Sequence, residues 1–156
     1  MCSSDLAVAT CLGCFAGSYS TALGLPASGQ CASCGAGLYS TATAAQSVAT
    51  CLGCFAGSYS TAVGLPASGQ CTSCGAGAYS TATAAQSAAT CLGCFAGSYS
   101  TALGLPTSAQ CTSCGAGLYS TATGAQAAVA CLGCFAGSYS TATGLPASGQ
   151  DRKSVV

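Results

Sequence analysis

The stretch CLGCFAGSYSTA at residues 51–62 decides the fold of this chain, because almost the whole sequence consists of copies of it. The same letters recur at residues 11–22, 91–102 and 131–142. Between these copies lie variants of the form C-x-S-C-G-A-G-x-Y-S-T-A, at residues 31–42, 71–82 and 111–122. The sequence therefore repeats every 20 residues, and two alternating types make a longer period of 40. A fixed period of this length is typical of repeat architectures.

Each part of the shared pattern C-x-x-C-x-x-G-x-Y-S-T-A predicts a local structure. The in-phase glycine, first seen at Gly17, can take the positive φ of a tight turn, and Tyr-Ser-Thr favours a short extended segment. The first type ends in G-L-P-x-S-x-Q, as at residues 64–70, where Leu-Pro and Ser-Gly indicate a second turn. The second type usually ends in A-A-Q-S-x-A-T, as at residues 84–90. The Ala-Thr-Ala-Ala-Gln stretch at residues 42–46 is the candidate for a helical turn, although its threonine disfavours one.

Such a unit has too little apolar surface to fold by itself. Large apolar side chains are sparse, whereas 15 residues are Cys and 22 are Gly. Ordering a residue costs about 1.5 kcal/mol, while one bridge that closes a loop of about 15 residues contributes roughly 3 kcal/mol. We therefore expect a small disulfide-rich repeat protein. Its predicted form is an elongated solenoid of 20-residue units, with short β-hairpins and turns, little helix and contacts mainly between neighbours.

The repeats occupy residues 7–150, with units that start at Cys11, Cys31, Cys51, Cys71, Cys91, Cys111 and Cys131. The two ends depart from the pattern. Cys2 aligns with Ala42, and Asp151 stands where the repeat requires cysteine. Residues 2–6 and 150–154 can be encoded by DNA that contains GCTCTTCCGATCT and AGATCGGAAGAGC, which are reverse complements and resemble an adapter used in short-read sequencing. We expect residues 1–6 and 151–156 to be a non-native leader and tail; a natural start and tail is the alternative, and the codons distinguish the two.

Three interpretations of the cysteines remain open. The first is structural disulfides, which suit a neutral, Ser- and Thr-rich chain in an oxidising compartment. The second is zinc, because C-x2-C-x16-C-x2-C has the spacing of a four-cysteine site. The third is a redox-active C-x-x-C motif. We favour disulfides, since a four-thiolate zinc site carries net negative charge and no Lys or Arg lies between Leu6 and Gln150.

Disulfides can be arranged in two ways. In a ladder, the second Cys of each C-x-x-C bonds the first Cys of the next, which gives Cys14–Cys31, Cys34–Cys51, Cys54–Cys71, Cys74–Cys91, Cys94–Cys111 and Cys114–Cys131. The ladder leaves Cys2, Cys11 and Cys134 outside its six bonds. The alternative is crossed pairing, such as Cys11–Cys31 with Cys14–Cys34. We favour the ladder, because each of its bridges encloses one Gly-x-Tyr hairpin.

The tyrosines recur at one phase of the repeat, at Tyr19, Tyr39, Tyr59, Tyr79, Tyr99, Tyr119 and Tyr139. Stacked units would align them in a row. We expect this row to pack against the next disulfide in each case. A ladder of rings that stacks on carbohydrate or another ligand is the alternative.

Composition excludes several classes of function. The charged residues are Asp5, Asp151, Arg152 and Lys153, so no basic patch exists for nucleic acid or for an anionic membrane. His is absent, the two acidic residues lie at opposite ends, and no Lys follows the glycines as in a phosphate loop. We therefore expect no enzyme activity, catalytic residue, metal site or cofactor. We also expect no membrane span, and a secretion signal that lies upstream of these residues.

The motif C-x-x-C-x-x-G-x-Y-S, followed by another C-x-x-C, resembles the ephrin-receptor-like cysteine-rich repeat. It is more distantly similar to modules of the tumour necrosis factor receptor ectodomain. The resemblance covers residues 11–150. It implies an extracellular or cell-surface, disulfide-bonded stalk or recognition segment of a larger protein, with a protein or carbohydrate as the ligand.

Overall fold

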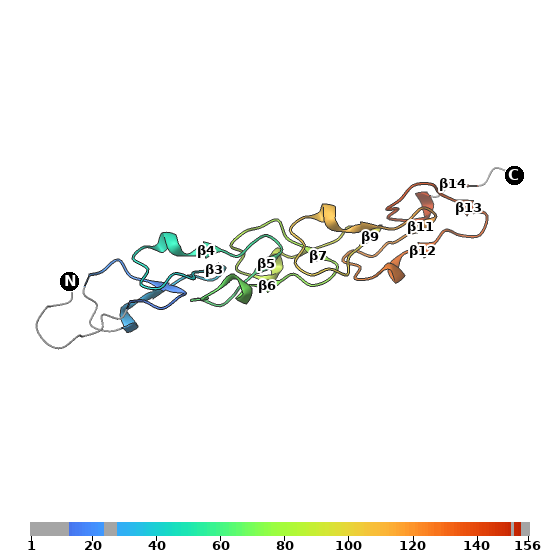
Figure 1. Ribbon diagram of the computed structural model, residues 1–156. Coiled ribbons are helices and arrows are strands. Elements are labelled where there is room, and N and C mark those ends of the chain that lie inside the picture. Colours follow the sequence, from blue (N-terminus) through green and yellow to red (C-terminus); the bar gives the residue numbers. More distant parts are fainter. Residues whose placement is uncertain (1–12, 24–27, 151, 154–156) are drawn as a thin grey trace, which may run out of the picture. The chain divides into compact units, whose positions relative to one another are not determined.

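A computed structural model describes residues 13–23, 28–150 and 152–153 of the chain. Regular structure in these residues consists of two-residue strands and three-residue 3-10 helices (Figure 1). The strands are β1 (Ser18–Tyr19), β2 (Ala32–Ser33), β3 (Leu38–Tyr39), β4 (Leu52–Gly53), β5 (Ser58–Tyr59), β6 (Thr72–Ser73), β7 (Ala78–Tyr79), β8 (Leu92–Gly93), β9 (Ser98–Tyr99), β10 (Thr112–Ser113), β11 (Leu118–Tyr119), β12 (Leu132–Gly133), β13 (Ser138–Tyr139) and β14 (Arg152–Lys153). The 3-10 helices are η1 (Ser28–Gln30), η2 (Val48–Thr50), η3 (Ser68–Gln70), η4 (Ala88–Thr90), η5 (Ser108–Gln110), η6 (Ala128–Ala130) and η7 (Ser148–Gln150).

Consecutive strands pair as separate two-stranded sheets, β1 with β2, β3 with β4, and so on to β13 with β14. In the β3–β4 hairpin, Tyr39 lies opposite Leu52 in antiparallel register. One strand of each pair carries the tyrosine of its repeat, and in β2 to β12 the other consists of the two residues inside the next C-x-x-C. The predicted disulfide-rich repeat with short hairpins and little helix is confirmed. The paired strand, however, ends at the tyrosine, and the backbone of the following serine hydrogen-bonds to other repeats, as the N–H of Ser40 donates to the carbonyl oxygen of Leu65.

The in-phase glycine forms the tight turn that leads into the tyrosine-bearing strand of each repeat. In the turn at residues 95–98, the N–H of Ser98 donates to the carbonyl oxygen of Phe95 at 3.0 Å, and Gly97 has a φ of 83°. Positive φ at the third position defines a type II turn, which glycine occupies without steric cost. The same φ, between 73° and 85°, recurs at Gly17, Gly37, Gly57, Gly77, Gly97, Gly117 and Gly137. The predicted role of this glycine is confirmed.

The helical turn considered for residues 42–46 is wrong. Ala44 and its counterpart Ala84 both have a φ of 53°, in the left-handed region, which interrupts a right-handed helix. The turn begins instead at η2, where the hydroxyl of Ser47 accepts from the N–H of Ala49 at 3.1 Å. In repeats of the first type the left-handed position is occupied by glycine, with a φ of 69° at Gly144.

Replacing Ala84 by glycine is expected to stabilise the protein by about 0.5–1 kcal/mol. Left-handed backbone costs a non-glycine residue roughly 1–2 kcal/mol, and the extra freedom of glycine in the unfolded chain offsets about 0.4–1 kcal/mol of that gain. The matched control is Ala82→Gly, at a residue of the same repeat without positive φ, which should only destabilise. Denaturant midpoints of the three proteins measure the effect. Equal losses in both variants would show that Ala84 carries no strain.

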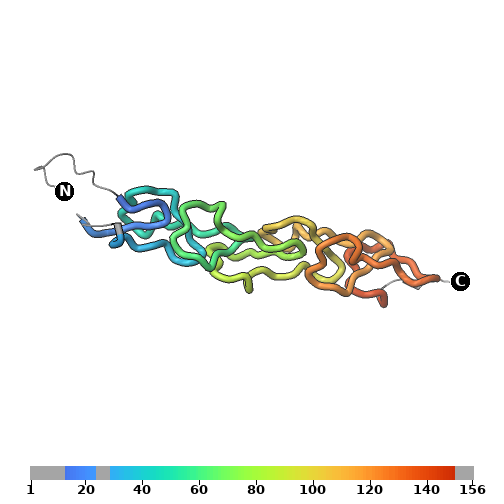
Figure 2. Tube along the Cα trace, turned by 90° about the horizontal axis from the view of Figure 1, so that it is seen from below, coloured from blue at the N-terminus to red at the C-terminus, as the bar shows by residue number. Residues whose placement is uncertain are grey.

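Buried serines join successive repeats through the backbone. The N–H of Ser40 donates to the carbonyl oxygen of Leu65 at 2.9 Å, and its carbonyl oxygen accepts from the N–H of Gly17 at 2.8 Å. Its hydroxyl accepts from the N–H of Ala42 at 3.3 Å, so the side chain is satisfied although it is 0% exposed. The bonds to Gly17 and Leu65 reach the repeats before and after, which is the neighbour-to-neighbour connection of repeat proteins. Figure 2 traces this succession of similar loops.

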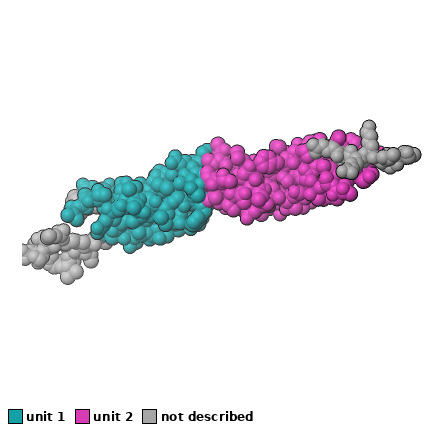
Figure 3. Space-filling model, turned by 90° about the horizontal axis from the view of Figure 1, so that it is seen from above, with its two compact units in different colours: residues 1–55, 59–72, 83–87 teal, residues 56–58, 73–82, 88–156 magenta. Residues whose placement is uncertain are grey.

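The chain divides into two compact units, coloured separately in Figure 3. The first comprises Met1–Phe55, Tyr59–Thr72 and Thr83–Ser87, and the second comprises Ala56–Ser58, Ser73–Ala82 and Ala88–Val156. Each contains a small buried cluster of one tyrosine, one leucine and a disulfide. The cores are thus local and repeated. The elongated solenoid stays a prediction.

Candidate functional site: the disulfide ladder and its aromatic side chains

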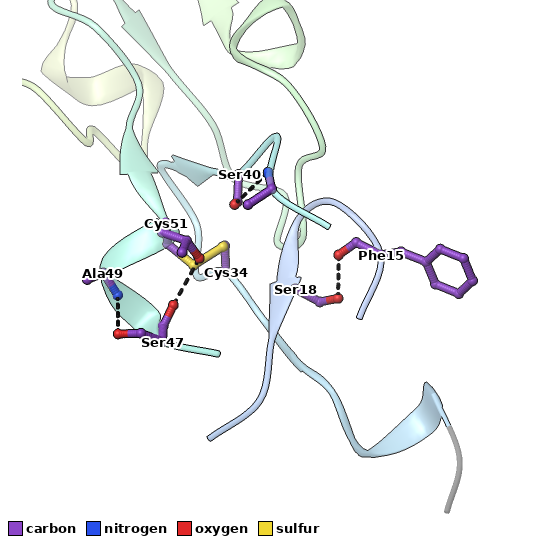
Figure 4. The surroundings of a disulfide bond; sticks show 9 residues. Phe15, Ser18, Cys34, Ser40, Ser47, Ala49 and Cys51 are labelled. Carbon is purple, nitrogen blue, oxygen red and sulfur yellow. Dashed lines mark hydrogen bonds between the residues drawn. A yellow bond between two sulfur atoms is a disulfide. The ribbon is translucent and has the colours of Figure 1, made fainter. Parts of the chain in front are cut away.

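Among the residues that the structure describes, six disulfides join neighbouring repeats. They are Cys14–Cys31, Cys34–Cys51, Cys54–Cys71, Cys74–Cys91, Cys94–Cys111 and Cys114–Cys131. Their Cα atoms are 5.6–5.9 Å apart, within the usual range for a disulfide. These are the pairs of the ladder and not those of the crossed arrangement. Figure 4 shows the Cys34–Cys51 bridge, in which Cys51 directly follows η2.

The backbone between the two cysteines of a C-x-x-C separates their sulfurs. The two intervening residues form a strand, such as β4 between Cys51 and Cys54. Side chains alternate along a strand, so positions three apart point to opposite faces. One sulfur therefore bonds the preceding repeat and the other bonds the following one. The second cysteine is the more buried: Cys54 is 0% exposed, whereas Cys51 is half-buried.

Hydrogen bonds from both sides hold the backbone of the buried cysteine. The N–H of Cys54 donates to the carbonyl oxygen of Gly37 at 2.8 Å. Its carbonyl oxygen accepts from the N–H of Ala84 at 2.8 Å. A buried peptide group without such partners would be costly. Hydrogen bonds to other repeats thus hold the backbone that carries the sulfur of Cys54.

Disulfide formation argues against the zinc alternative. A sulfur in a disulfide has no thiolate charge to offer a metal, and the six bridges use both cysteines of five complete C-x-x-C motifs. Within the described residues, no three His, Cys, Asp or Glu side chains are grouped so that they could hold a metal ion. The same bonding links different C-x-x-C motifs, whereas a redox-active motif bonds its own two cysteines.

The three cysteines left outside the ladder have different places. Cys134 is half-buried and belongs to none of the six bridges, and its N–H donates to the carbonyl oxygen of Gly117 at 3.0 Å. Cys2 and Cys11 lie outside the described residues, as do the leader at 1–6 and most of the tail. In the tail, β14 pairs with β13 in antiparallel register, at the position that β12 takes beside β11 one repeat earlier.

The tyrosines do not form a uniform row. Tyr39 and Tyr79 are each 7% exposed, whereas Tyr59 and Tyr99 are half-buried and Tyr139 is 53% exposed. Tyr39 packs with Leu65 and with the Cys54–Cys71 bridge of the next repeat, and Tyr79 packs in the same way against Cys94–Cys111. Packing against the next disulfide is therefore confirmed for the two buried tyrosines.

Both buried tyrosines pair with a phenylalanine, whereas Tyr119 has the same kind of partner and is half-buried. The ring of Phe55 lies 6.2 Å from that of Tyr39 in a tilted arrangement, and equivalent pairs are Tyr79–Phe95 and Tyr119–Phe135. Tyr19, Tyr59 and Tyr99 are each followed by a repeat that has glycine at this phase, such as Gly75. The phenylalanines remain 61–66% exposed, at Phe15, Phe55, Phe95 and Phe135. This contact was not predicted from the sequence, although the alternation of Phe and Gly after the second cysteine signals it.

Replacing Leu105 by alanine is expected to lower the free energy of unfolding by about 2–3 kcal/mol. Leu105 is 7% exposed in the cluster with Tyr79 and Cys94, and truncating a buried leucine removes its burial energy and leaves a cavity. The matched control is Leu103→Ala, two residues away and 68% exposed, which should stay within about 0.5 kcal/mol. Denaturant unfolding of both variants checks the difference, and similar losses would contradict the packing assigned to Leu105.

A shallow hollow lies beside one exposed phenylalanine. Its volume is about 290 Å³ and its lining includes Phe95, Ser98, Ser108, Cys111 and Ser113. Cys111 is bonded in the ladder, so the lining offers hydroxyls, peptide groups and an aromatic ring. Such a surface suits contact with a neutral molecule and supplies no general base.

No protein-family model matches the chain, and no curated protein matches it significantly. Over the part of the chain that the structure describes, none of the helices has the length and apolar character needed to cross a membrane. The structure itself therefore gives the classification: the chain is a disulfide-rich repeat module of the kind found in oxidising environments.

Proposed function

We propose that this chain is a non-catalytic structural, adhesive or recognition spacer of a larger extracellular or cell-surface protein. The observation that carries the proposal is the sharing of five C-x-x-C motifs between successive bridges, as Cys51 and Cys54 belong to two different bridges. The repeats are thereby linked covalently in series by bonds that persist in oxidising compartments. Its resemblance to ephrin-receptor-like cysteine-rich repeats supports the same assignment.

The surface chemistry supports a spacer and not an enzyme. Between Leu6 and Gln150 no side chain carries a formal charge, and the chain has no His. Catalytic hydroxyls require an activating base, and none accompanies these serines and threonines. The exposed phenylalanines place an apolar ring at the surface once every 40 residues of the sequence. Its ligand would be a neutral or apolar surface of a protein or carbohydrate.

Thiol counting on the natively purified protein tests the proposal against its rival, a zinc-binding C-x-x-C protein of a reducing compartment. The protein is denatured without reductant, alkylated and analysed by mass, and bound zinc is measured in parallel. We expect the twelve cysteines of the six bridges to resist alkylation, with zinc far below one ion per chain. Mostly reactive thiols together with stoichiometric zinc would refute the proposal and support the rival.

A further inference from the structure

The disulfides create a short covalent route that bypasses most of the chain. Each bridge closes a loop with a sequence separation of 17, and the next loop opens three residues after it, as Cys74 follows Cys71. The loops follow one another without overlap. When a chain is pulled from its ends, tension passes along the shortest covalent path. That path crosses each bridge and each C-x-x-C linker, and it omits the residues inside the loops.

The linkers on this path are already extended. The inner residues of the five linkers between successive bridges are the strands β2, β4, β6, β8 and β10. A strand rises about 3.3 Å per residue, close to the maximum span of a polypeptide. Each linker pairs with a strand of the preceding loop, as Thr112 of β10 lies opposite Tyr99 of β9. The covalent path therefore stores little length that a pulling force can release.

We propose that the repeat array is a tension-bearing tether whose maximum length is set by the disulfide ladder. This inference deepens the proposed spacer function and rests on it. With the bridges intact, the path from Cys14 to Cys131 reaches about 85 Å at full stretch, from bridges of 5.6–5.9 Å and linkers of about 3.4 Å per residue. The same segment without bridges reaches about 400 Å.

The division into path and loops also separates mechanical from contact functions. The aromatic side chains lie inside the loops, as Phe95 and Tyr99 lie between Cys94 and Cys111. Their loop is closed by its bridge and carries no covalent tension. The loops that carry these side chains stay closed by their bridges while the linkers bear the pulling force.

Single-molecule force spectroscopy on the full chain, held by handles at both ends, tests the tether. Without reductant, stretching should release no long segment from the bridged region. Adding a water-soluble phosphine at constant force should lengthen the chain in steps of about 50 Å, one closed loop for each bridge. In each event the bridge becomes two thiols, and the phosphine becomes a phosphine oxide that takes its oxygen from water, which also supplies the two protons.

A variant provides the control. Cys94→Ala combined with Cys111→Ala should start about 50 Å longer at full stretch and should show one step fewer in the phosphine. If this variant does not fold, the step size and the total lengthening of the unaltered protein in the phosphine still test the tether. The residues outside the bridges, 1–13 and 132–156, can release at most about 130 Å. Release of clearly more than this without reductant, or steps that do not match one loop, would overturn the tether. If the force experiment overturns the tether but thiol counting finds the cysteines oxidised, the proposed extracellular spacer function still holds. If thiol counting finds free thiols, the spacer and the tether are both refuted.

Discussion

Replacing Gly97 by alanine is expected to lower the free energy of unfolding by more than about 3 kcal/mol. Gly97 has a φ of 83°, which costs an alanine roughly 1–2 kcal/mol. An added Cβ would also overlap the carbonyl oxygen of Gly144, a backbone atom of a later repeat that cannot move aside as a side chain can. The substitution should displace both repeats. Denaturant unfolding, with hydrogen exchange at the N–H of Cys114 that donates to Gly97, measures the loss.

Two other glycines separate the causes of this effect. Gly137 has a φ of 80° but nothing within 4 Å of an added Cβ, so Gly137→Ala should cost only the roughly 1–2 kcal/mol of backbone strain. Gly75 has neither positive φ nor a close neighbour, and Gly75→Ala should change stability by less than about 0.5 kcal/mol. Equal effects at Gly97 and Gly137 would show that the contact with Gly144 does not limit the side chain.

Removing one bridge, by Cys94→Ala together with Cys111→Ala, is expected to lower the free energy of unfolding by about 3 kcal/mol. The bridge closes a loop with a sequence separation of 17, and its loss restores that loop's freedom to the unfolded chain. Cys94 is also fully buried against Tyr79 and Leu105, so the shorter alanine weakens this cluster. Denaturant unfolding without reductant gives the loss.

The same measurement in reductant separates cross-link from packing. In reductant all six bridges open in both proteins, so both should lose most of their folded structure and the difference in stability between them should disappear. A difference that persists would assign the effect to sulfur packing around Tyr79. A double variant as stable as the unaltered protein without reductant would show that this bridge does not stabilise the fold.

The local structure of the repeat could be read from the sequence. The in-phase glycine predicted a turn, and residues such as Gly97 have the positive φ that such a turn requires. Sparse apolar side chains and frequent cysteines predicted a cross-linked repeat with little helix. These inferences succeed because they depend on properties within one repeat: backbone freedom, composition and the energy needed to order the chain.

Two local features escaped the sequence because neighbouring repeats decide them. Ala44 takes the left-handed backbone conformation that glycine has in repeats of the first type. In this conformation the N–H of Ala44 donates to the carbonyl oxygen of Cys14 at 2.7 Å. The preference of alanine for helix gives no sign of this. Tyr39 is buried because Phe55 and Leu65 cover it, and Tyr59 is not because its neighbours are smaller.

By itself, the sequence determined that this chain repeats every 20 residues, turns at its glycines and needs cross-links. It left both the ladder and the crossed pairing open, because the C-x-x-C spacing allows either. The tertiary structure decided between them. Strands such as β4 direct the sulfurs of Cys51 and Cys54 to opposite sides, toward different repeats. Hydrogen bonds between repeats set that direction, and the spacing of residues along the chain does not encode them.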